Sequence, residues 1–470
     1  MDNIDALFDA LRQAADPEAA EALHGLVRDG RDEELGRINA LAFASGNGLN
    51  QEVAIAAMLH AAQLGILEMS WNILCPSCCG VLDANATLHS VRQENYHCAF
   101  CTLDAEPVLD DTVEVTFGVS ARVRRVPAHD PDHLSFWDYH RQVFFGSGVV
   151  FRADPSFQDL AAAAVSENAE LQPGERIIFS LHVAPGAIIL FDPVTHSAQS
   201  ITVNQEPAAE PQELTMVLGG LRGTMPQATV HSGALRIRFD NRTDRRVLPG
   251  VFVAGAALST LLSDRRPFLT AKRLLSNQTF RDIYRTDTLA VDQRLKILNL
   301  TFLFTDLKGS TELYDRVGDL VAYDLVRAHF RILNEIVAAE GGAVVKTIGD
   351  AVMATFPNPH QALAAALRMR TAMQSREQQP GSAPLTLKIG MHAGPCLAVN
   401  LNDRQDYFGQ TVNIASRVQE LASSDSIFAT EAVVSGQEAQ RLIAANRIEA
   451  RSQARSLRGV GTRMSVVELG

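Results

Sequence analysis

The sequence predicts a multidomain α/β protein, and three observations lead to this fold class. The chain has 470 residues, which is more than one ordinary domain contains. Hydrophobic residues make up 46% and charged residues 20% of it, a composition typical of globular proteins. The pattern changes from helix-like repeats, through many short strands, to strands that alternate with longer helices. We expect five segments with boundaries at residues 1–74, 75–108, 109–265, 266–297 and 298–470.

The first segment, residues 1–74, has the pattern of several helices followed by a strand. A helix-like run over 50–62 follows a polar turn, and residues 66–74 are strand-like. This order is similar to that of a winged helix. Residues 1–70 hold 12 acidic residues and four arginines, a net charge of −8, which would repel the phosphates of a nucleic acid. We therefore expect a winged-helix-like segment that docks a protein or has a structural role, and no nucleic acid as partner.

Four of the six cysteines form two C-x₂-C pairs in the second segment, residues 75–108. Cys75 and Cys78 form one pair, Cys98 and Cys101 form the other, and 19 residues separate the pairs. This spacing is typical of a zinc ribbon, in which four thiolates complete a tetrahedral site. The alternatives are two disulfides, which are disfavoured in the cytosol, or unrelated free thiols. We predict a structural Zn²⁺.

The third segment, residues 109–265, contains short alternating strands separated by Asp, Asn, Gly and Pro turns. This rhythm is typical of an antiparallel β-sandwich. No group of residues in it indicates catalysis, so a regulatory role and a passive scaffold both remain open. The predicted strands cover 112–119, 176–183, 187–191, 200–203, 214–217, 228–239 and 247–253.

The fourth segment, residues 266–297, is predicted to be a linker helix that couples its two neighbours. Its apolar positions do not keep a strict heptad. No run in the chain reaches 18 apolar residues, and the N-terminus lacks the basic region of a secretory signal. We expect a cytoplasmic protein with no membrane partner.

Two aspartates in the last segment, residues 298–470, each follow a short apolar strand. Asp306 follows the run 300–304, and Asp350 follows the run 344–348 and a glycine. Carboxylates near a core must be neutralised, and Mg²⁺ takes one or two carboxylates together with phosphate oxygens. The pair therefore indicates a metal site for phosphoryl chemistry.

Further polar residues surround the two aspartates. The run Gly309–Ser310–Thr311 begins a helix, where exposed N–H groups could bind a triphosphate. Lys346 is four residues before Asp350 and is predicted on the same side of its strand. Asn413 and Arg417 are four residues apart and share one helix face, and Asp406 is predicted in the loop before that helix. Each residue alone has an ordinary structural explanation, but six in this order and spacing favour a single site.

Residues 298–470 resemble the catalytic domain of class III nucleotidyl cyclases, the adenylate/guanylate cyclase family. The resemblance is carried by three runs. They are Phe304-Thr305-Asp306 with Gly309-Ser310-Thr311, Lys346-Thr347-Ile348-Gly349-Asp350, and Gly409-Gln410-Thr411-Val412-Asn413-Ile414-Ala415-Ser416-Arg417. It implies a ferredoxin-like α+β domain with a βαββαβ core that works as a homodimer, with its active sites at the subunit interface.

The resemblance also implies roles for the charged residues. Asp306 and Asp350 would hold two Mg²⁺ or Mn²⁺ ions per active site, which serve in-line displacement at phosphorus. Lys346 and Asp406 would bind the base. A lysine donates to adenine N1 and an aspartate accepts from the adenine N6 amino group, whereas guanine reverses both edges, so ATP is the expected substrate.

Asn413 would orient the ribose, and Arg417 would neutralise charge on the α-phosphate in the transition state. Because all six residues are in one chain, the resemblance implies a symmetric homodimer with two equivalent sites. We expect an adenylate cyclase that makes cyclic AMP and pyrophosphate, regulated through its N-terminal half by a protein or small molecule. A guanylate cyclase, or a catalytically silent dimerising regulator, is the alternative.

Overall fold

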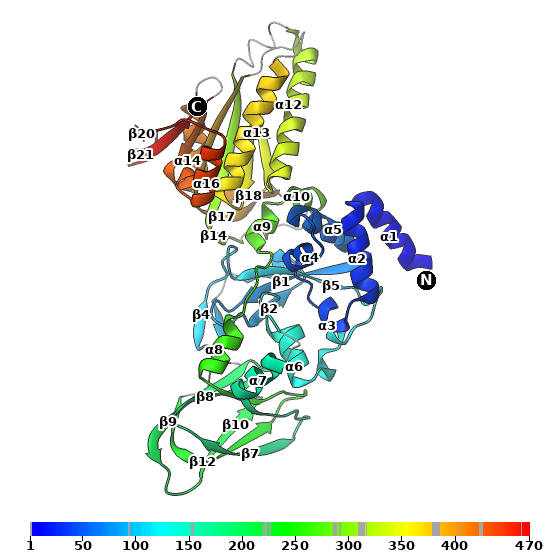
Figure 1. Ribbon diagram of the computed structural model, residues 1–470, viewed down its shortest axis with the longest axis vertical. Coiled ribbons are helices and arrows are strands. Elements are labelled where there is room, and N and C mark those ends of the chain that lie inside the picture. Colours follow the sequence, from blue (N-terminus) through cyan, green and yellow to red (C-terminus); the bar gives the residue numbers. More distant parts are fainter. Residues whose placement is uncertain are drawn as a thin grey trace. The chain divides into compact units, whose positions relative to one another are not determined.

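The chain forms two compact units in the computed structural model (Figure 1). The first unit contains residues 1–87, 94–107 and 112–269, and the second contains 88–93, 108–111 and 270–470. The five predicted segments divide the chain more finely than these two units. The structure describes residues 2–92, 95–151, 155–219, 223–224, 227–284, 289–290, 293–308, 315, 317–377, 386–402, 404–422, 426–461 and 463–470.

Helices open the first unit, and side-chain caps set where three of them begin. Asp16, Asn39 and Asn50 each accept hydrogen bonds from two backbone N–H groups of the helix that follows, which satisfies donors that have no partner inside the helix. The helix predicted over 50–62 and the strand predicted over 66–74 are both observed. The elements are α1 (Asp2–Ala14), α2 (Pro17–Asp29), α3 (Asp32–Leu35), α4 (Ala40–Gly46), α5 (Gln51–Gln63) and β1 (Leu67–Leu74).

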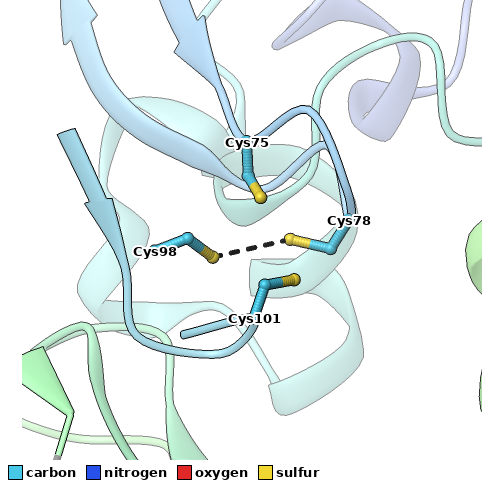
Figure 2. Close-up of side chains that lie close together, drawn as sticks. All are labelled: Cys75, Cys78, Cys98 and Cys101. Carbon is cyan, nitrogen blue, oxygen red and sulfur yellow. Dashed lines mark hydrogen bonds between the residues drawn. The ribbon is translucent and has the colours of Figure 1, made fainter. Parts of the chain in front are cut away.

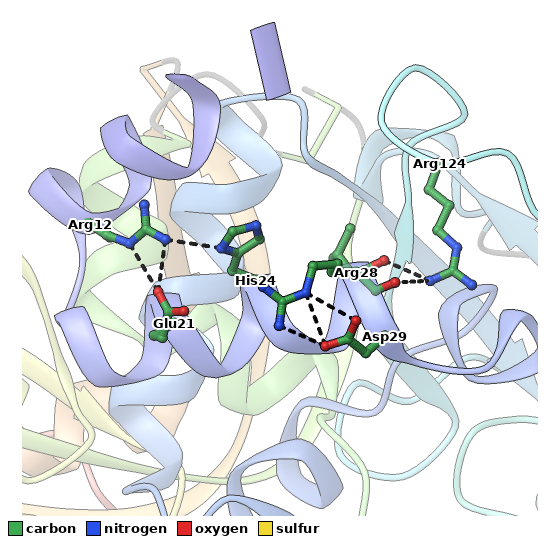
Figure 3. A network of polar contacts seen from close by, with 7 residues as sticks. Arg12, Glu21, His24, Arg28, Asp29 and Arg124 are labelled. Carbon is green, nitrogen blue, oxygen red and sulfur yellow. Dashed lines mark hydrogen bonds and ion pairs between the residues drawn. The ribbon is translucent and has the colours of Figure 1, made fainter. Parts of the chain in front are cut away.

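Arginines tie α2 to its neighbours on the surface of this helical part (Figure 3). Arg12 of α1 pairs with Glu21 of α2 at 2.8 Å. Arg124 donates to the backbone carbonyls of Val27 and Arg28 at the C-terminal end of α2, at 2.8 and 3.2 Å. A cation at that end satisfies carbonyls that have no partner inside the helix and complements the helix dipole.

Strand β1 is the centre of a three-stranded antiparallel sheet in the order β2-β1-β5. The outer strands are β2 (Val81–Asn85) and β5 (Val113–Val119). The strand at 112–119 was predicted to belong to the later β-rich segment, but β5 pairs with β1 along its whole length. Trp71, 1% exposed, belongs to the core beside this sheet.

The β-rich part forms an eight-stranded arrangement around one core. Long strand β12 changes neighbours at Gly233, whose φ is +120°: residues 228–232 pair with β9 and residues 233–241 with β7 and β10. The prediction of a wholly antiparallel arrangement was wrong, because β9 and β10 both run parallel to β12. The strands are β6 (Val165–Asn168), β7 (Arg176–Val183), β8 (Gly186–Asp192), β9 (Ser197–Pro207), β10 (Gln212–Leu218), β11 (Gly223–Thr224), β12 (Ala228–Asn241) and β13 (Gly250–Val253).

The segment predicted as one coupling helix is instead two short helices, α9 (Ala271–Leu275) and α10 (Gln278–Ile283). The break is encoded at Asn277, whose side chain accepts from the N–H of Phe280 at 3.0 Å and so begins a new helix. In the same unit Lys272 pairs with Asp110 at 2.8 Å. The linker is therefore fixed within the second unit rather than extended as a rod.

The second unit contains the predicted βαββαβ core. Its sheet has the order β15-β16-β14-β17-β19-β21-β20, and the first four strands are all antiparallel neighbours. Numbered along the core, these four strands stand in the order 2-3-1-4, which is the ferredoxin-like arrangement. The core elements are β14 (Leu295–Lys308), α12 (Asp319–Ala339), β15 (Ala343–Ile348), β16 (Ala351–Phe356), α13 (Pro359–Glu377) and β17 (Thr386–Leu401).

Helices cover the two faces of this sheet unequally. On one face, α12 and α13 pack with Leu303, Leu307 and the alternate residues of β16 and β17 in a large apolar core. On the other face, α14 packs with Phe428. The two residues beside Phe428, Ile427 and Ala429, belong to the first core, because successive side chains of a strand point to opposite faces. The later elements are β18 (Arg404–Phe408), α14 (Gln410–Glu420), β19 (Ile427–Thr430), α15 (Glu431–Val434), α16 (Gln437–Ala445), β20 (Ala450–Ser456) and β21 (Arg463–Leu469).

Candidate active site and cysteine cluster

Asp306 lies near the end of β14, on the face of the sheet that α14 covers. Leu303 and Leu307 point into the core under α12 and α13. Because successive side chains of a strand point to opposite faces of the sheet, Asp306, next to Leu307, points to the other face. Its cross-strand neighbour is Lys388 of β17, whose Nζ is 3.8 Å from Asp306 Oδ2. The Asp306 side chain is 34% exposed and the Lys388 side chain 27%. The residues Gly309–Ser310–Thr311, predicted to bind phosphate, lie outside the described part of the chain.

Asp350 lies in the tight turn between β15 and β16, next to Gly349 with φ +64°. A glycine adopts this left-handed conformation without strain, so the sequence Gly-Asp can turn the chain sharply here. The expected strand before Asp350 is present, and β16 follows the turn. Its Oδ2 atom is buried and has no hydrogen-bond partner among the described residues.

The electrostatics of the two aspartates favour a bound cation. Burial raises the pKa of Asp306, and the negative charge of Asp350 raises it further, while Lys388 and a hydrogen bond from Gln419 oppose the shift. Two carboxylates that repel each other, one with a buried oxygen lacking a donor in the described part of the chain, are stabilised when a cation comes between them. Oxygen ligands of this kind suit Mg²⁺ or Mn²⁺. The residues present therefore fit a divalent metal.

Lys346 and Asp406 form an ion pair from two different strands. Lys346 Nζ is 2.5 Å from Asp406 Oδ2, with side chains 43% and 11% exposed. The other carboxylate oxygen of Asp406 accepts from the backbone N–H of Tyr407 at 2.8 Å. Asp406 was predicted in a loop, but it lies on β18, opposite Val399 of β17. The structure therefore brings together the two residues that the sequence predicted to bind the base.

Asn413 and Arg417 lie on α14, as predicted, and share its outer face. The inner face of α14 buries Thr411, Ile414, Ala415 and Val418, whereas Asn413 is exposed and Arg417 is half-buried. Arg417 pairs with Glu420 one turn further along the helix. Among the described residues, neither Asn413 nor Arg417 has a hydrogen bond or ion pair with Asp306 or Asp350.

Two residues of the site were missed by the sequence analysis. Lys388 is a lone cation in the apolar run 387–391, and its register opposite Asp306 became visible only once the strands were paired. Gln419 reaches Asp306 because α14 approaches β17 very closely at Gly390. A Cβ atom at Gly390 would lie 2.1 Å from the backbone nitrogen of Gln419, so only glycine permits this approach.

The four paired cysteines converge in the first unit (Figure 2). Cys75 and Cys78 lie in the turn between β1 and β2. Cys98 and Cys101 lie in the turn between β3 (Tyr96–Cys98) and β4 (Leu103–Ala105). All four sulfur atoms lie within 4.8 Å of one another, and those of Cys78 and Cys98 are 3.7 Å apart. No disulfide joins them.

The geometry of this cluster fits a tetrahedral metal ion. Hydrogen bonds among the four cysteines lower the pKa of the Cys75 thiol and raise those of Cys78 and Cys98, so the protonation of the four sulfurs is linked. The N–H of Gly80 points to Cys78 Sγ at 3.3 Å, a backbone donor that stabilises a metal-bound thiolate. Four sulfurs from two hairpin turns are the donor set of structural zinc sites. Cys79 is buried beside the cluster but is not part of it.

Comparison with known proteins identifies the class of the second unit. Residues 293–460 match the family described as the adenylate and guanylate cyclase catalytic domain. The predicted class III nucleotidyl cyclase domain is thereby confirmed. Residues 1–282, more than half of the chain, match a second family model, and the chain belongs to this family of unknown function, DUF5939.

Similar curated proteins align with less than a third of this chain. An adenylate cyclase from Streptomyces coelicolor is 33% identical over 138 residues, covering 29% of this chain and 32% of the relative. An adenylate cyclase from Anabaena cylindrica is 31% identical over 150 residues, covering 29% and 30%. Receptor-type adenylate cyclase A from Leishmania donovani is 26% identical over 170 residues, covering 28% and 12%. The chain thus spans less than a third of the length of each of these relatives.

Solved cyclase structures also resemble part of this chain. The adenylyl cyclase CyaB from P. aeruginosa is 23% identical and covers 38% of this chain and 96% of its own, with a TM-score of 0.32. The guanylyl cyclase Cya2 is 19% identical and covers 38% and 92%, with a TM-score of 0.33. In the described part of the chain, every helix is too short or too polar to cross a bilayer.

Proposed function

We propose that the protein is a homodimeric adenylate cyclase that converts ATP to 3′,5′-cyclic AMP and pyrophosphate. The observation that carries this proposal is the contact between Lys346 and Asp406, because a donor and an acceptor held side by side match the N1 and N6 edge of adenine. Guanine presents a donor at N1 and an acceptor at O6, so both groups would be left unpaired. A buried polar group without a partner is costly enough to exclude the wrong base.

Asp306 and Asp350 would hold two Mg²⁺ or Mn²⁺ ions, which supply charge neutralisation at the phosphates and activation of the ribose 3′-hydroxyl. Two observations support this role: Asp350 Oδ2 is buried without a hydrogen-bond partner among the described residues, and the pKa of Asp306 is raised. Lys388 limits the repulsion between the two carboxylates by holding a positive charge 3.8 Å from Asp306. Gln419 donates to Asp306 and so restricts its rotation.

Asn413 and Arg417 would act in the active site of a second copy of the chain. Their position on the outer face of α14 supports this arrangement, because the helix presents them away from its own core. Arg417 would exchange Glu420 for the α-phosphate when the second copy docks. A symmetric dimer then has two equivalent sites, each completed by both chains.

The cysteine cluster is proposed to hold a structural Zn²⁺ in a zinc-ribbon-like pair of hairpins, beside a winged-helix-like helical part. Its four sulfurs within 4.8 Å support this assignment. We also propose that the N-terminal unit regulates the cyclase from a cytoplasmic location, in response to a protein or small-molecule signal.

The decisive experiment is an assay of the purified protein with ATP or GTP and Mn²⁺, beside Asp350→Ala. Cyclic AMP is expected as the product, at least about a hundredfold faster than cyclic GMP, and Asp350→Ala should be inactive. Cyclic GMP as the main product would overturn the base assignment. Equal activity of the variant would overturn the metal assignment, and an inactive wild-type dimer would identify a silent regulator.

A further inference from the structure

A cavity of about 430 Å³ in the first unit carries an excess of positive charge. The whole chain has a net charge of −12, so a cationic cavity runs against its overall composition. The volume lies in the range of small-molecule sites. The charged residues that line the cavity are Arg31, Arg37, Arg141, Arg266, Glu33 and Glu34.

Both carboxylates of the cavity, Glu33 and Glu34, form ion pairs, but only two of the four arginines take part in them. Arg31 pairs with Glu33 at 2.9 Å and with Glu34 at 2.6 Å. Arg141 pairs with the other oxygen of Glu33. Arg37 and Arg266 have no ion pair with any residue in the part of the chain that the structure describes.

Backbone carbonyls rather than carboxylates hold these two arginines in place. Arg37 donates to the carbonyl of Val143 at 3.0 Å and to that of Phe145. Arg266 donates through Nε to the carbonyl of Ser147 at 2.9 Å. A guanidinium has five N–H donors, so each head group is fixed in position and keeps donors for a further partner.

One buried carboxylate, Glu114, lies close enough to influence both arginines without neutralising them. It accepts hydrogen bonds from the N–H and Oγ of Ser147 at 2.9 and 2.6 Å, and from Asn72 at 3.2 Å. Burial lowers the pKa of Arg37 and of Arg266 despite the attraction of Glu114. Arg37 is half-buried, whereas Arg266 remains exposed to solvent.

The remaining wall of the cavity combines one unsatisfied donor with an apolar surface. The Nε–H of Arg141 is buried and has no acceptor among the residues that the structure describes, and the guanidinium of Arg141 lies 5.9 Å from the ring centroid of Phe151. The apolar lining residues are Leu26, Ile38, Phe43, Val149, Val150 and Phe151. A ligand that fits both parts carries oxyanions at one end and an apolar group at the other.

We propose that this cavity binds a small phosphate monoester whose organic group is apolar. Arg37 and Arg266, neither of which has an ion pair among the described residues, can face the near-double negative charge of a phosphate monoester at pH 7, and the planar guanidinium fork suits phosphate oxygens. All of the lining residues belong to the first unit. The site is therefore separate from the residues proposed for cyclase chemistry, and ligand binding there is a property beyond the proposed cyclase activity.

Isothermal titration of the full-length protein with phenyl phosphate, without nucleotide or added divalent metal, tests this site. Phenyl phosphate should bind about tenfold more tightly than benzoate, which has one charge, and benzyl alcohol should bind most weakly. Equal affinity for phenyl phosphate and benzoate would overturn the two-charge argument. No binding of phenyl phosphate at millimolar concentration would overturn the site itself.

Variants distinguish a specific binding site from non-specific attraction of anions. Arg266→Gln and Arg141→Gln should each weaken phenyl phosphate binding about tenfold, with unchanged circular dichroism. The matched control is Arg28→Gln, which removes an exposed arginine of α2 that pairs with Asp29 outside the cavity (Figure 3). Equal weakening in all three variants would contradict the proposal. Cyclase activity is not part of the measurement, so this test and that of the proposed function can fail separately.

Discussion

The two candidate metal centres of this chain differ in how complete they are within one copy. The cysteine cluster has four sulfurs within 4.8 Å, three of its four residues are buried, and no further ligand is needed. The aspartate pair is partly exposed, offers two carboxylates, and has an oxygen without a partner among the described residues. A closed donor set suits a structural ion, whereas an open one leaves room for substrate oxygens. A complete set of protein ligands therefore indicates a structural metal ion, whereas an incomplete set indicates a metal ion that takes part in catalysis.

Removing one carboxylate from the open centre should produce the largest effect. Asp350→Asn keeps the size of the side chain but removes the charge that a divalent metal needs. We expect cyclase activity to fall at least about a thousandfold, because metal neutralisation contributes several kcal/mol to the transition state. The unfolding temperature should stay the same or rise, since the repulsion on Asp306 is relieved.

Calorimetry together with a cyclic AMP assay checks both parts of this prediction. The matched control is Asp319→Asn, which removes a carboxylate outside the site, at the first residue of α12. A variant at Asp350 that lost stability in proportion to its activity would show that the carboxylate is structural, and the contrast between the two centres would then disappear.

Mixing two inactive variants tests whether the open centre is completed by a second copy. Asp306→Ala removes a proposed metal ligand, and Arg417→Ala removes the proposed transition-state cation. When the two are mixed, half of the dimers should be mixed, each with one intact site, so about a quarter of wild-type activity should return. Asp306→Ala mixed with Asp350→Ala is the control and should stay inactive. No recovery in the first mixture would mean that each site lies within one chain.

Breaking the closed centre should affect stability instead of chemistry. Cys78→Ser leaves three thiolates, so the zinc content should fall from one ion per chain to near zero and the first unit should lose on the order of 5 kcal/mol. Metal analysis and chemical unfolding measure these two quantities. Cys79→Ser is the matched control, because Cys79 is buried next to the cluster without belonging to it. Full zinc occupancy in Cys78→Ser would contradict the four-cysteine site.

The same contrast explains which parts could be predicted from the sequence. The spacing of the cysteine pairs and the apolar strand before Asp306 are local patterns and could be predicted from the sequence, whereas the βαββαβ order was implied by the family resemblance. Asp406 was assigned to a loop, although β17 and β18 form a local hairpin in which Asp406 lies opposite Val399, only seven residues earlier in the chain. Parallel pairing of β9 and β10 with β12 was missed for a different reason, since strand direction is set by the connections between strands and not by composition.

The break between α9 and α10 could have been predicted. Asn277 is a strong helix N-cap, and it stands three residues before the N–H of Phe280 to which it bonds. Lys388 could not have been linked to Asp306 without the register of β14 and β17. The helix break at Asn277 thus depends on neighbours in the chain, whereas the position of Lys388 beside Asp306 depends on neighbours in the sheet.

Protonation of a single buried histidine should produce the smallest effect, and each unit should show it. Each unit contains a buried histidine that stays neutral: His140 is fully buried with its Nδ1 hydrogen-bonded to the carbonyl of Phe136, and His392 is 7% exposed beside Thr430. Burial lowers the pKa of each to about 4, whereas an unfolded histidine titrates near pH 6.5. Between these values the unfolded chain binds more protons, so stability falls as the pH drops through this window.

The full loss between about pH 6.5 and pH 4 is on the order of 3 kcal/mol for each histidine. Hydrogen exchange read separately on peptides of the two units measures it, and His392→Gln should flatten the response of the second unit only. Protonation of thiolates releases zinc as well, so the first unit should lose more stability than the second over the same pH range. An equal loss in both units would mean that the cysteine cluster adds nothing to stability, which would remove the difference between a closed and an open centre.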